Sequence, residues 1–244
     1  MVANVCDLAA MGAKPVLATI ALGIPVEFSE KQVLELYRGF TKVTDDAKIS
    51  IVGGDITRAP VWTISVTAIG EVRQTNVKLR SGAKSGDILA CTGPLGASRA
   101  GLKFLSNELQ ITDERAREEA LRAYRTPAAR WREGMWLGAS TNVHAMMDCS
   151  DGLSTDVARM CEASNVGISI ENVPLGPGVP DADFALAGGE DYELLTAIAP
   201  RAFEYLAGRF RKHFGRPLYR IGVFDANKKP PQRSGYDHLA SHTG

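Results

Sequence analysis

Two aspartates end an apolar run in the stretch "MMDCSDGL", residues 146–153. Asp148 and Asp151 flank a serine, and two carboxylates with a hydroxyl exceed what one helix cap needs. Carboxylates directed into one cleft repel each other unless a cation lies between them. Magnesium takes oxygen ligands, often one or two carboxylates together with substrate phosphates. The pair therefore favours a metal site over helix capping, whereas Asp156, one helical turn further on, is expected to face solvent.

Two more aspartates follow apolar runs and have a glycine nearby. Asp7 lies in "NVCDLAAMG" and Asp55 in "ISIVGGDIT". Each alone is as compatible with capping as with metal binding, because aspartate is a common capping residue. The double glycine Gly53-Gly54 allows the backbone to approach a ligand closely. In isolation, however, Gly-Gly-Asp is more typical of an ordinary turn.

A second acidic pair follows two glycines in "ALAGGEDYELL". Glu190 and Asp191 come directly after Gly188-Gly189, and a strand with Tyr192 on one face is expected next. The pattern is equally compatible with a hairpin turn and with a polar substrate site. Both interpretations stay open at this level.

Basic residues gather in the loop "KLRSGAKSGD", which contains Lys78, Arg80 and Lys84. The planar guanidinium suits phosphate, but a solvated loop is the default interpretation of exposed charges. The turn "GPLGASRAG" lacks the Lys-Ser/Thr of a Walker A motif, which excludes that kind of phosphate loop. His144 has no acidic partner nearby in the sequence and is predicted to be a core residue.

Composition excludes several classes of function. Lysine plus arginine equal aspartate plus glutamate at 28 each among 244 residues, so a basic nucleic-acid footprint or membrane-surface patch has no support. The apolar stretches are far shorter than the roughly 20 residues of a membrane span. The scattered cysteines form no CxxC pair and predict reduced thiols in a cytoplasmic protein; they are Cys6, Cys91, Cys149 and Cys161.

Periodicity predicts an α+β (mixed α/β) fold in two domains, over residues 1–74 and 75–244, because strands and helices mix irregularly around a polar, turn-rich stretch after Val72. Helices are expected over 2–12, 29–47, 94–107, 112–124, 127–140, 152–164 and 201–214, with Pro94 in the first turn of the third. Strands are expected over 16–23, 48–53, 61–72, 88–93, 143–148, 166–175 and 218–224, and after the "GGED" turn. The apolar pattern is already running at Met1 without a cap, so we expect the first domain to lack an N-terminal segment.

Several motifs together resemble thiamine-monophosphate kinase, of the superfamily that includes aminoimidazole ribonucleotide synthetase and selenophosphate synthetase. The resemblance runs through nearly the whole chain, and "GGEDYELL" is its most discriminating motif. The others are "NVCDLAAMGAKP", "IVGGDITRAP", "AIGEV", "RSGAKSGDILACTGPLG", "DCSDGLSTDVARM" and "SGYDH". The resemblance implies a two-domain synthetase-like fold with an incomplete N-terminal sheet domain and a C-terminal domain of mixed sheet with helices.

The resemblance also implies ATP-dependent phosphorylation of thiamine monophosphate to thiamine diphosphate, with Mg²⁺ assisting direct transfer and no dedicated catalytic base. It implies a homodimer if the N-terminal sheet is complete, and the charge balance predicts that neither nucleic acid nor membrane is a partner. The magnesium ligands it implies are Asp7, Asp55, Asp148 and Asp151. Contacts to ATP fall on Gly54, Asp55, Arg80 and Ser150, and contacts to the thiamine substrate on Glu190 and Tyr236.

The sequence departs from the family pattern at four points. Cys6 replaces the serine of the usual "N-x-S-D", and "TPAAR" stands where Pro-x-Pro-Arg is expected. A paired-aspartate segment and a later Asp-rich strand have no match. Two alternatives therefore stay open: a non-catalytic nucleotide-binding remnant of the family, or a related ATP-using synthetase.

Overall fold

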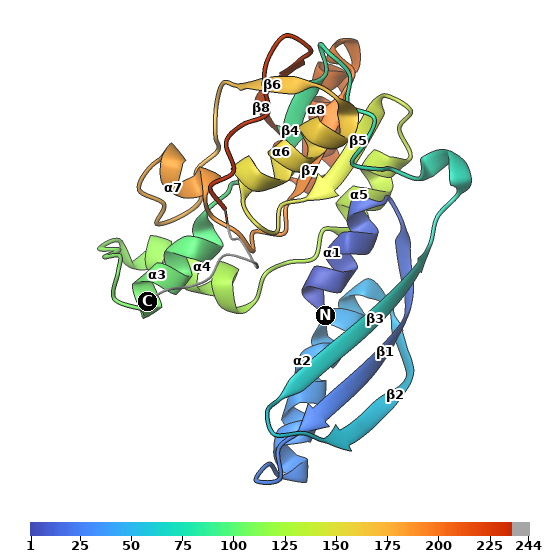
Figure 1. The fold of residues 1–244 in the computed structure, drawn as a ribbon, viewed down its shortest axis with the longest axis vertical. Helices are drawn as coiled ribbons and strands as arrows, with labels where there is room; N and C mark the ends of the chain where they lie inside the picture. Colours follow the sequence, from blue (N-terminus) through green and yellow to red (C-terminus); the bar gives the residue numbers. More distant parts are fainter. Residues whose placement is uncertain (236–244) are drawn as a thin grey trace.

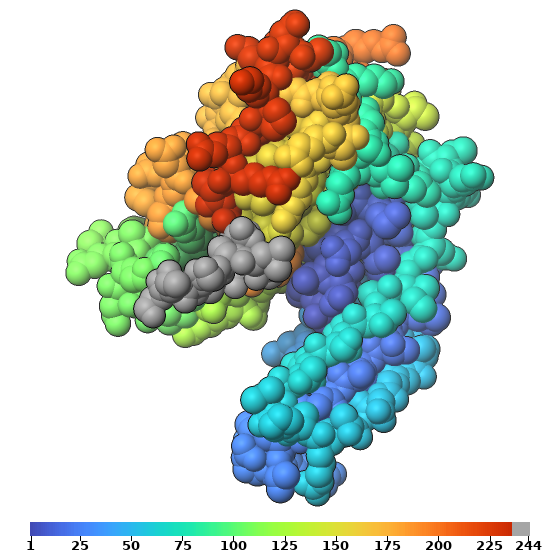
Figure 2. Space-filling view, viewed as in Figure 1, coloured from blue at the N-terminus to red at the C-terminus, as the bar shows by residue number. Residues whose placement is uncertain are grey.

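The computed structural model describes residues 1–235, which form two units joined by a linker (Figure 1). The smaller unit contains the first helix and a three-stranded sheet, and the larger one contains a five-stranded sheet with helices on both faces. Figure 2 shows the smaller unit projecting from the larger one. No helix within residues 1–235 is long and apolar enough to cross a membrane.

The smaller sheet has the strand order β2-β1-β3 and is mixed. Strand β1 (Lys14–Ile24) pairs in parallel with β2 (Ser50–Arg58) and antiparallel with β3 (Thr63–Glu71). Helix α2 (Glu30–Ala47) begins at a capping box formed by Ser29 and Gln32, and its Phe40 packs against Ile20 and Leu22 of the sheet. One face of the sheet is thereby buried.

Strand β2 is longer than predicted and includes the double glycine that the sequence favoured as a turn. Gly54 pairs with Ile20 of β1, and a Cβ at position 54 would collide with the Ile20 carbonyl oxygen. The glycine is therefore required by close approach of two strands, not by a reversal of the chain.

The larger sheet has the order β5-β7-β4-β8-β6, and every described pair in it is antiparallel. The expectation of a mixed C-terminal sheet was therefore wrong; the mixed sheet is the N-terminal one. Its strands are β4 (Ile88–Cys91), β5 (Val143–Asp148), β6 (Gly167–Ile170), β7 (Leu194–Ile198) and β8 (Tyr219–Asp225).

Helices cover both faces of this sheet. Helix α6 (Leu153–Ser164) packs Leu153, Val157 and Met160 on one face. On the other face lie α8 (Pro200–Phe214), α5 (Trp131–Gly138) and the end of α1 (Val2–Ala10). Helix α1 lies so close to α5 that a Cβ on Gly134 would collide with the Ala9 carbonyl oxygen. This contact connects the two units and sets the position of α1.

Three further helices lie beside the larger sheet. They are α3 (Ala97–Leu105), α4 (Glu114–Arg125) and the short α7 (Ala182–Leu186), which the sequence did not predict. Pro94 precedes α3 instead of lying in its first turn, because Gly96 at φ 84° starts the helix. The 3₁₀ turn η1 (Gln74–Asn76) begins the linker. All four cysteines are buried free thiols.

Candidate functional site

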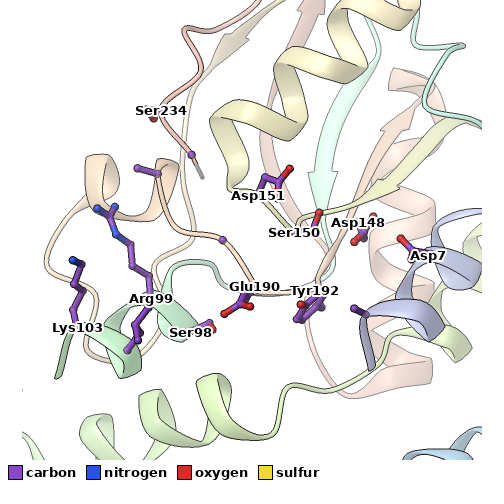
Figure 3. Close-up of a pocket in the computed structure, with 15 residues that line it drawn as sticks. Asp7, Ser98, Arg99, Lys103, Asp148, Ser150, Asp151, Glu190, Tyr192 and Ser234 are labelled. Carbon is purple, nitrogen blue, oxygen red and sulfur yellow. The ribbon is translucent and has the colours of Figure 1, made fainter. Parts of the chain in front are cut away.

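A cavity of about 930 Å³ opens between α1, α3, the start of α6 and the segment 187–192 (Figure 3). Its walls carry opposite charges. Asp7, Asp148 and Asp151 lie on one side, and Arg99 and Lys103 of α3 lie on the other. The predicted residues Ser150 and Glu190 also line it.

The acidic wall combines residues from two units. Asp7 comes from the middle of α1, and Asp148 is the last residue of β5. Burial, with a smaller contribution from the charge of Asp7, raises the pKa of Asp148 to about 6. Burial also raises the pKa of Asp7, although Arg80 opposes this. Within residues 1–235, neither carboxylate forms an ion pair with a basic side chain, so their charges lack a direct counter-ion there.

Asp151 belongs to a loop held by Asp156. One Asp156 oxygen accepts hydrogen bonds from the backbone N–H groups of Ser150, Asp151 and Gly152, at 2.9, 2.9 and 3.1 Å. Asp156 is fully buried, so the expectation that it faces solvent was wrong. The loop amides need an acceptor after the strand ends, and a carboxylate one helical turn later supplies it.

The "GGEDYELL" motif alternates between inward and cavity-facing side chains. Asp191 accepts hydrogen bonds from the N–H groups of Gly96 and Ser98, at the start of α3. Glu190 and Tyr192 have positive φ values of 61° and 52° and line the cavity. The expected strand begins only at Leu194, so Tyr192 is a turn residue. Non-glycine residues in this conformation cost free energy and are often found at functional sites.

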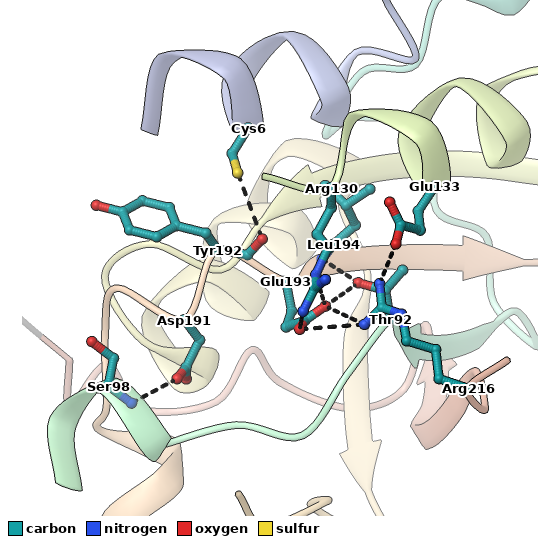
Figure 4. A network of polar contacts seen from close by, with 10 residues as sticks. All are labelled: Cys6, Thr92, Ser98, Arg130, Glu133, Asp191, Tyr192, Glu193, Leu194 and Arg216. Atoms are coloured by element: carbon teal, nitrogen blue, oxygen red, sulfur yellow. Dashed lines mark hydrogen bonds and ion pairs between the residues drawn. The ribbon is translucent and has the colours of Figure 1, made fainter. Parts of the chain in front are cut away.

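Glu193 anchors the same motif in a buried network of charges (Figure 4). Its carboxylate accepts from Arg130 at 2.5 and 3.0 Å and from the Thr92 hydroxyl at 2.6 Å. Arg216 contacts Glu193 at 3.3 Å and Glu133 at 2.6 Å. Two arginines therefore neutralise two glutamates behind the cavity. This network holds the base of the turn that presents Glu190 and Tyr192.

The basic wall was missed by sequence reasoning. Arg99 lies over the Phe184 ring at 4.4 Å and donates to the Phe184 carbonyl oxygen, and Lys103 forms an ion pair with Glu108. Ser98 lines the cavity beside them. The motif "GPLGASRAG" contains Ser98 and Arg99, but it lacks the Walker A lysine that would have marked it as a phosphate site. The basic wall is formed only when α7 and the segment 187–192 pack against α3, and both are distant from α3 in the sequence.

The remaining predicted site residues divide into three groups. Arg80 lines a neighbouring cavity of about 330 Å³ that shares Asp7 and Asp148 with the larger one. Gly54 and Asp55 lie exposed on β2, outside both cavities. Tyr236 lies outside the described residues. The structure thus brings together Asp7, Asp148, Asp151, Ser150 and Glu190, with Arg80 alongside, but not Gly54 or Asp55.

His144 has no acidic partner nearby in the sequence, but in the fold its Nδ1 lies 2.8 Å from an oxygen of Asp87, 57 residues away. The pair connects β5 to the residue directly before β4, across the end of β7, and lines neither cavity. The partner was invisible in the sequence because sheet formation brought it close.

The acidic wall suits magnesium better than a metal held by protein ligands alone. Within residues 1–235, no three His, Cys, Asp or Glu side chains cluster tightly enough to hold a metal ion. Magnesium usually keeps several waters and takes one or two carboxylates together with substrate phosphates. Asp7 and Asp148 line the same wall, and burial together with the charge of Asp7 raises the pKa of Asp148, which fits such a cation.

Comparison with known proteins agrees with this architecture. Family models of the AIR synthase related proteins match in two parts: the N-terminal domain over residues 1–72 and the C-terminal domain over residues 84–230. The thiamine-monophosphate kinase of Synechococcus elongatus is 33% identical over 258 residues, which cover 98% of this chain and 78% of that relative. This chain belongs to the thiamine-monophosphate kinase family. The resemblance inferred from the motifs is confirmed.

Solved structures of thiamine-monophosphate kinases share the fold. The enzyme from Stenotrophomonas maltophilia K279a superposes with a TM-score of 0.84 at 32% identity, over 93% of this chain and 75% of that one. The structure described as AaThiL complexed with AMPPCP and TMP gives 0.82 at 28% identity, over 97% and 78%. The predicted mixed α/β synthetase-like fold is thereby confirmed, and the chain belongs to a family of phosphate-transferring enzymes.

Proposed function

We propose that this protein catalyses ATP-dependent phosphorylation of thiamine monophosphate to thiamine diphosphate. Family membership supports the reaction, and a relative of the same fold was solved with AMPPCP and TMP. The observation that carries the proposal is the single cavity with an acidic wall on one side and a basic wall on the other. Transfer between two phosphate compounds requires both kinds of charge.

Phosphoryl transfer depends on positioning and charge neutralisation more than on covalent chemistry. Asp7, Asp148 and Asp151 would hold Mg²⁺, which supplies neutralisation of the nucleotide's phosphate charge when it is bound. The acidic side of the cavity thus corresponds to the nucleotide triphosphate. Because the acceptor phosphate is already anionic, the reaction needs no general base.

The basic wall is the proposed site for the acceptor phosphate. Arg99 is held over Phe184, which leaves part of its guanidinium for an anion. Lys103 and Ser98 lie on the same helix and line the same cavity. A phosphate placed there would lie across the cavity from the metal-bound nucleotide. This arrangement allows attack on the terminal phosphoryl group.

The roles given to other residues remain part of the proposal. Ser150 and Glu190 line the cavity and support contacts with ATP and substrate respectively. Arg80 is close enough to lower the pKa of Asp148 and could reach an extended polyphosphate. Three predictions stay untested. They are the metal and nucleotide contacts of Gly54 and Asp55, substrate binding by Tyr236, and the division into domains 1–74 and 75–244.

A homodimer is part of the same proposal. Strands β2 and β3 expose the aliphatic side chains Val52, Ile56 and Ile69, which are 49 to 58% accessible. Apolar side chains on edge strands are typical of protein interfaces. Cytoplasmic location is proposed from the four buried free thiols. Sedimentation of the purified chain tests the dimer.

The reaction is tested by incubating the chain with ATP, Mg²⁺ and thiamine monophosphate and separating the products by chromatography. Thiamine diphosphate is expected, and it should disappear when EDTA is added. Binding of Mg-ATP without turnover would indicate a nucleotide-binding remnant instead. Consumption of ATP without thiamine diphosphate would indicate a related synthetase.

A further inference from the structure

The loop 150–152 forms a nest of backbone donors that is filled from within the protein. Three successive N–H groups converge on one oxygen of Asp156, at 2.9 to 3.1 Å. Such nests elsewhere bind phosphate or other anions. Here a fully buried carboxylate occupies the nest, so its donors are not available to the nucleotide. The loop has its conformation before any ligand arrives.

Arg159 extends this arrangement to the cavity wall. Its NH1 group lies 2.8 Å from the second oxygen of Asp156 and 2.5 Å from an oxygen of Asp151. The guanidinium is 31% exposed, whereas the Asp151 side chain is 16% exposed. Arg159 therefore connects the buried anchor of the loop to a carboxylate at the cavity. Asp7 and Asp148 form no comparable ion pair with a basic side chain within residues 1–235.

We propose that Arg159 is a positioning residue that acts as the internal counter-cation of Asp151 and weakens the affinity of the acidic wall for divalent cations. This inference rests on the proposed magnesium role of that wall. A guanidinium stays charged at every accessible pH, so its field persists when a metal ion approaches. Arg159 keeps Asp151 oriented toward the cavity and limits cation binding in the absence of nucleotide.

The electrostatic consequence has a definite sign. A positive charge beside a carboxylate lowers the negative potential available to a second cation. Removing the charge of Arg159 while keeping a side chain of similar length should therefore tighten cation binding. A purely structural role predicts lower stability with unchanged or weaker cation binding. The two roles are thus separable by a binding measurement.

The test measures Mn²⁺ binding to the full chain by titration calorimetry at low ionic strength, without nucleotide. Arg159→Met is expected to lower the Mn²⁺ Kd by about tenfold. Arg159→Lys keeps the charge and should stay within about twofold of the wild type. Arg220→Met is the matched control, because it removes an exposed ion pair with Glu171 away from both cavities, and should leave the Kd unchanged.

Equal or weaker Mn²⁺ binding by a folded Arg159→Met variant would overturn the inference while leaving the proposed reaction intact. If that variant does not fold, Arg159→Gln provides the neutral replacement with retained polarity, and the same result is required of it. If the wild-type chain makes thiamine diphosphate and binds Mn²⁺, the variants test the inference separately from the proposed function. A wild-type chain that neither binds Mn²⁺ together with ATP nor makes thiamine diphosphate would overturn both.

Discussion

Two clusters of charge lie on opposite sides of the "GGEDYELL" turn, and they differ in how their charges are neutralised. In the network behind the turn, Arg130 and Arg216 neutralise Glu193 and Glu133 through hydrogen bonds within the protein. On the cavity wall, Asp7 and Asp148 repel each other, and the pKa of Asp148 is raised to about 6 by burial and by that repulsion. The charges of the first cluster are neutralised within the protein, whereas the proposed counter-charge of the second cluster is a bound cation.

The contrast separates charges that maintain structure from charges that we propose to serve a reaction. A buried ion pair is costly to break, because the remaining partner keeps its desolvation penalty. A crowded carboxylate lowers the stability of the free protein and becomes favourable only with a ligand. Between them, Asp191 and Glu193 fix the turn and Glu190 and Tyr192 face the cavity, so one motif connects both clusters.

The largest expected effect comes from neutralising the acidic wall. Asp148→Asn should lower kcat/KM for thiamine diphosphate formation by about 1000-fold, because one of the carboxylates proposed to hold Mg²⁺ against the phosphates is lost. The product assay measures it. Asp45→Asn on the exposed face of α2 is the control, with activity expected within twofold. Near-normal turnover by Asp148→Asn would show that the wall takes no part in catalysis.

The next largest expected effect comes from removing Arg130 from the buried network of charges around Glu193. Arg130→Met should lower the free energy of unfolding by about 3 kcal/mol, because Glu193 would keep its burial but lose its bidentate partner. Urea denaturation measures the difference. Arg132→Met, two residues along, removes an ion pair whose partners are 54% and 53% exposed, and should cost less than about 0.5 kcal/mol. Equal losses from the two variants would contradict the contrast.

The acidic wall should also give the unliganded protein a characteristic pH dependence. The pKa of Asp148 is raised from 3.8 to about 6, so folding favours its protonated form. Its contribution to stability is present below pH 3.8 and is lost as the pH rises through about 6. The metal-free wild type should therefore lose on the order of 2 kcal/mol relative to Asp148→Asn across this window. Parallel stability curves for the two proteins, measured by urea denaturation between pH 4 and pH 7, would refute this.

The smallest expected effect is a change in the free energy of unfolding on substitution in the turn between the clusters. Glu190→Gly should raise the free energy of unfolding by about 0.5 kcal/mol, because glycine adopts the positive φ of 61° without steric cost, while kinase activity falls. Lys48→Gly at the end of α2, with φ 55°, should relieve a similar conformation without changing activity. Thermal unfolding and the product assay measure both. Loss of stability in Glu190→Gly would show that the side chain stabilises the fold.

Local patterns predicted the elements well where short-range physics dominates. Helix α2 is capped by Ser29 and strand β5 covers 143–148, as the capping residue and the apolar run indicated. The local patterns failed at positions whose conformation or burial depends on a segment distant in the sequence. The Gly53-Gly54 pair looked like a turn but lies inside β2, because strand β1 approaches too closely for a side chain. Asp156 looked solvent-exposed but is buried under loop amides that fold back over it.

The sequence by itself determined the family, the positions of most elements and the carboxylates at 7, 148 and 151, because motif order, periodicity and residue chemistry are properties of the chain. Only the tertiary structure decided which charges meet. It placed Arg99 and Lys103 across from the aspartates, paired Arg130 with Glu193 63 residues away, and kept Gly54 and Asp55 outside the cavity. The physical reason is that electrostatic interactions depend on distance in space and on burial, and both are set by how the two units pack.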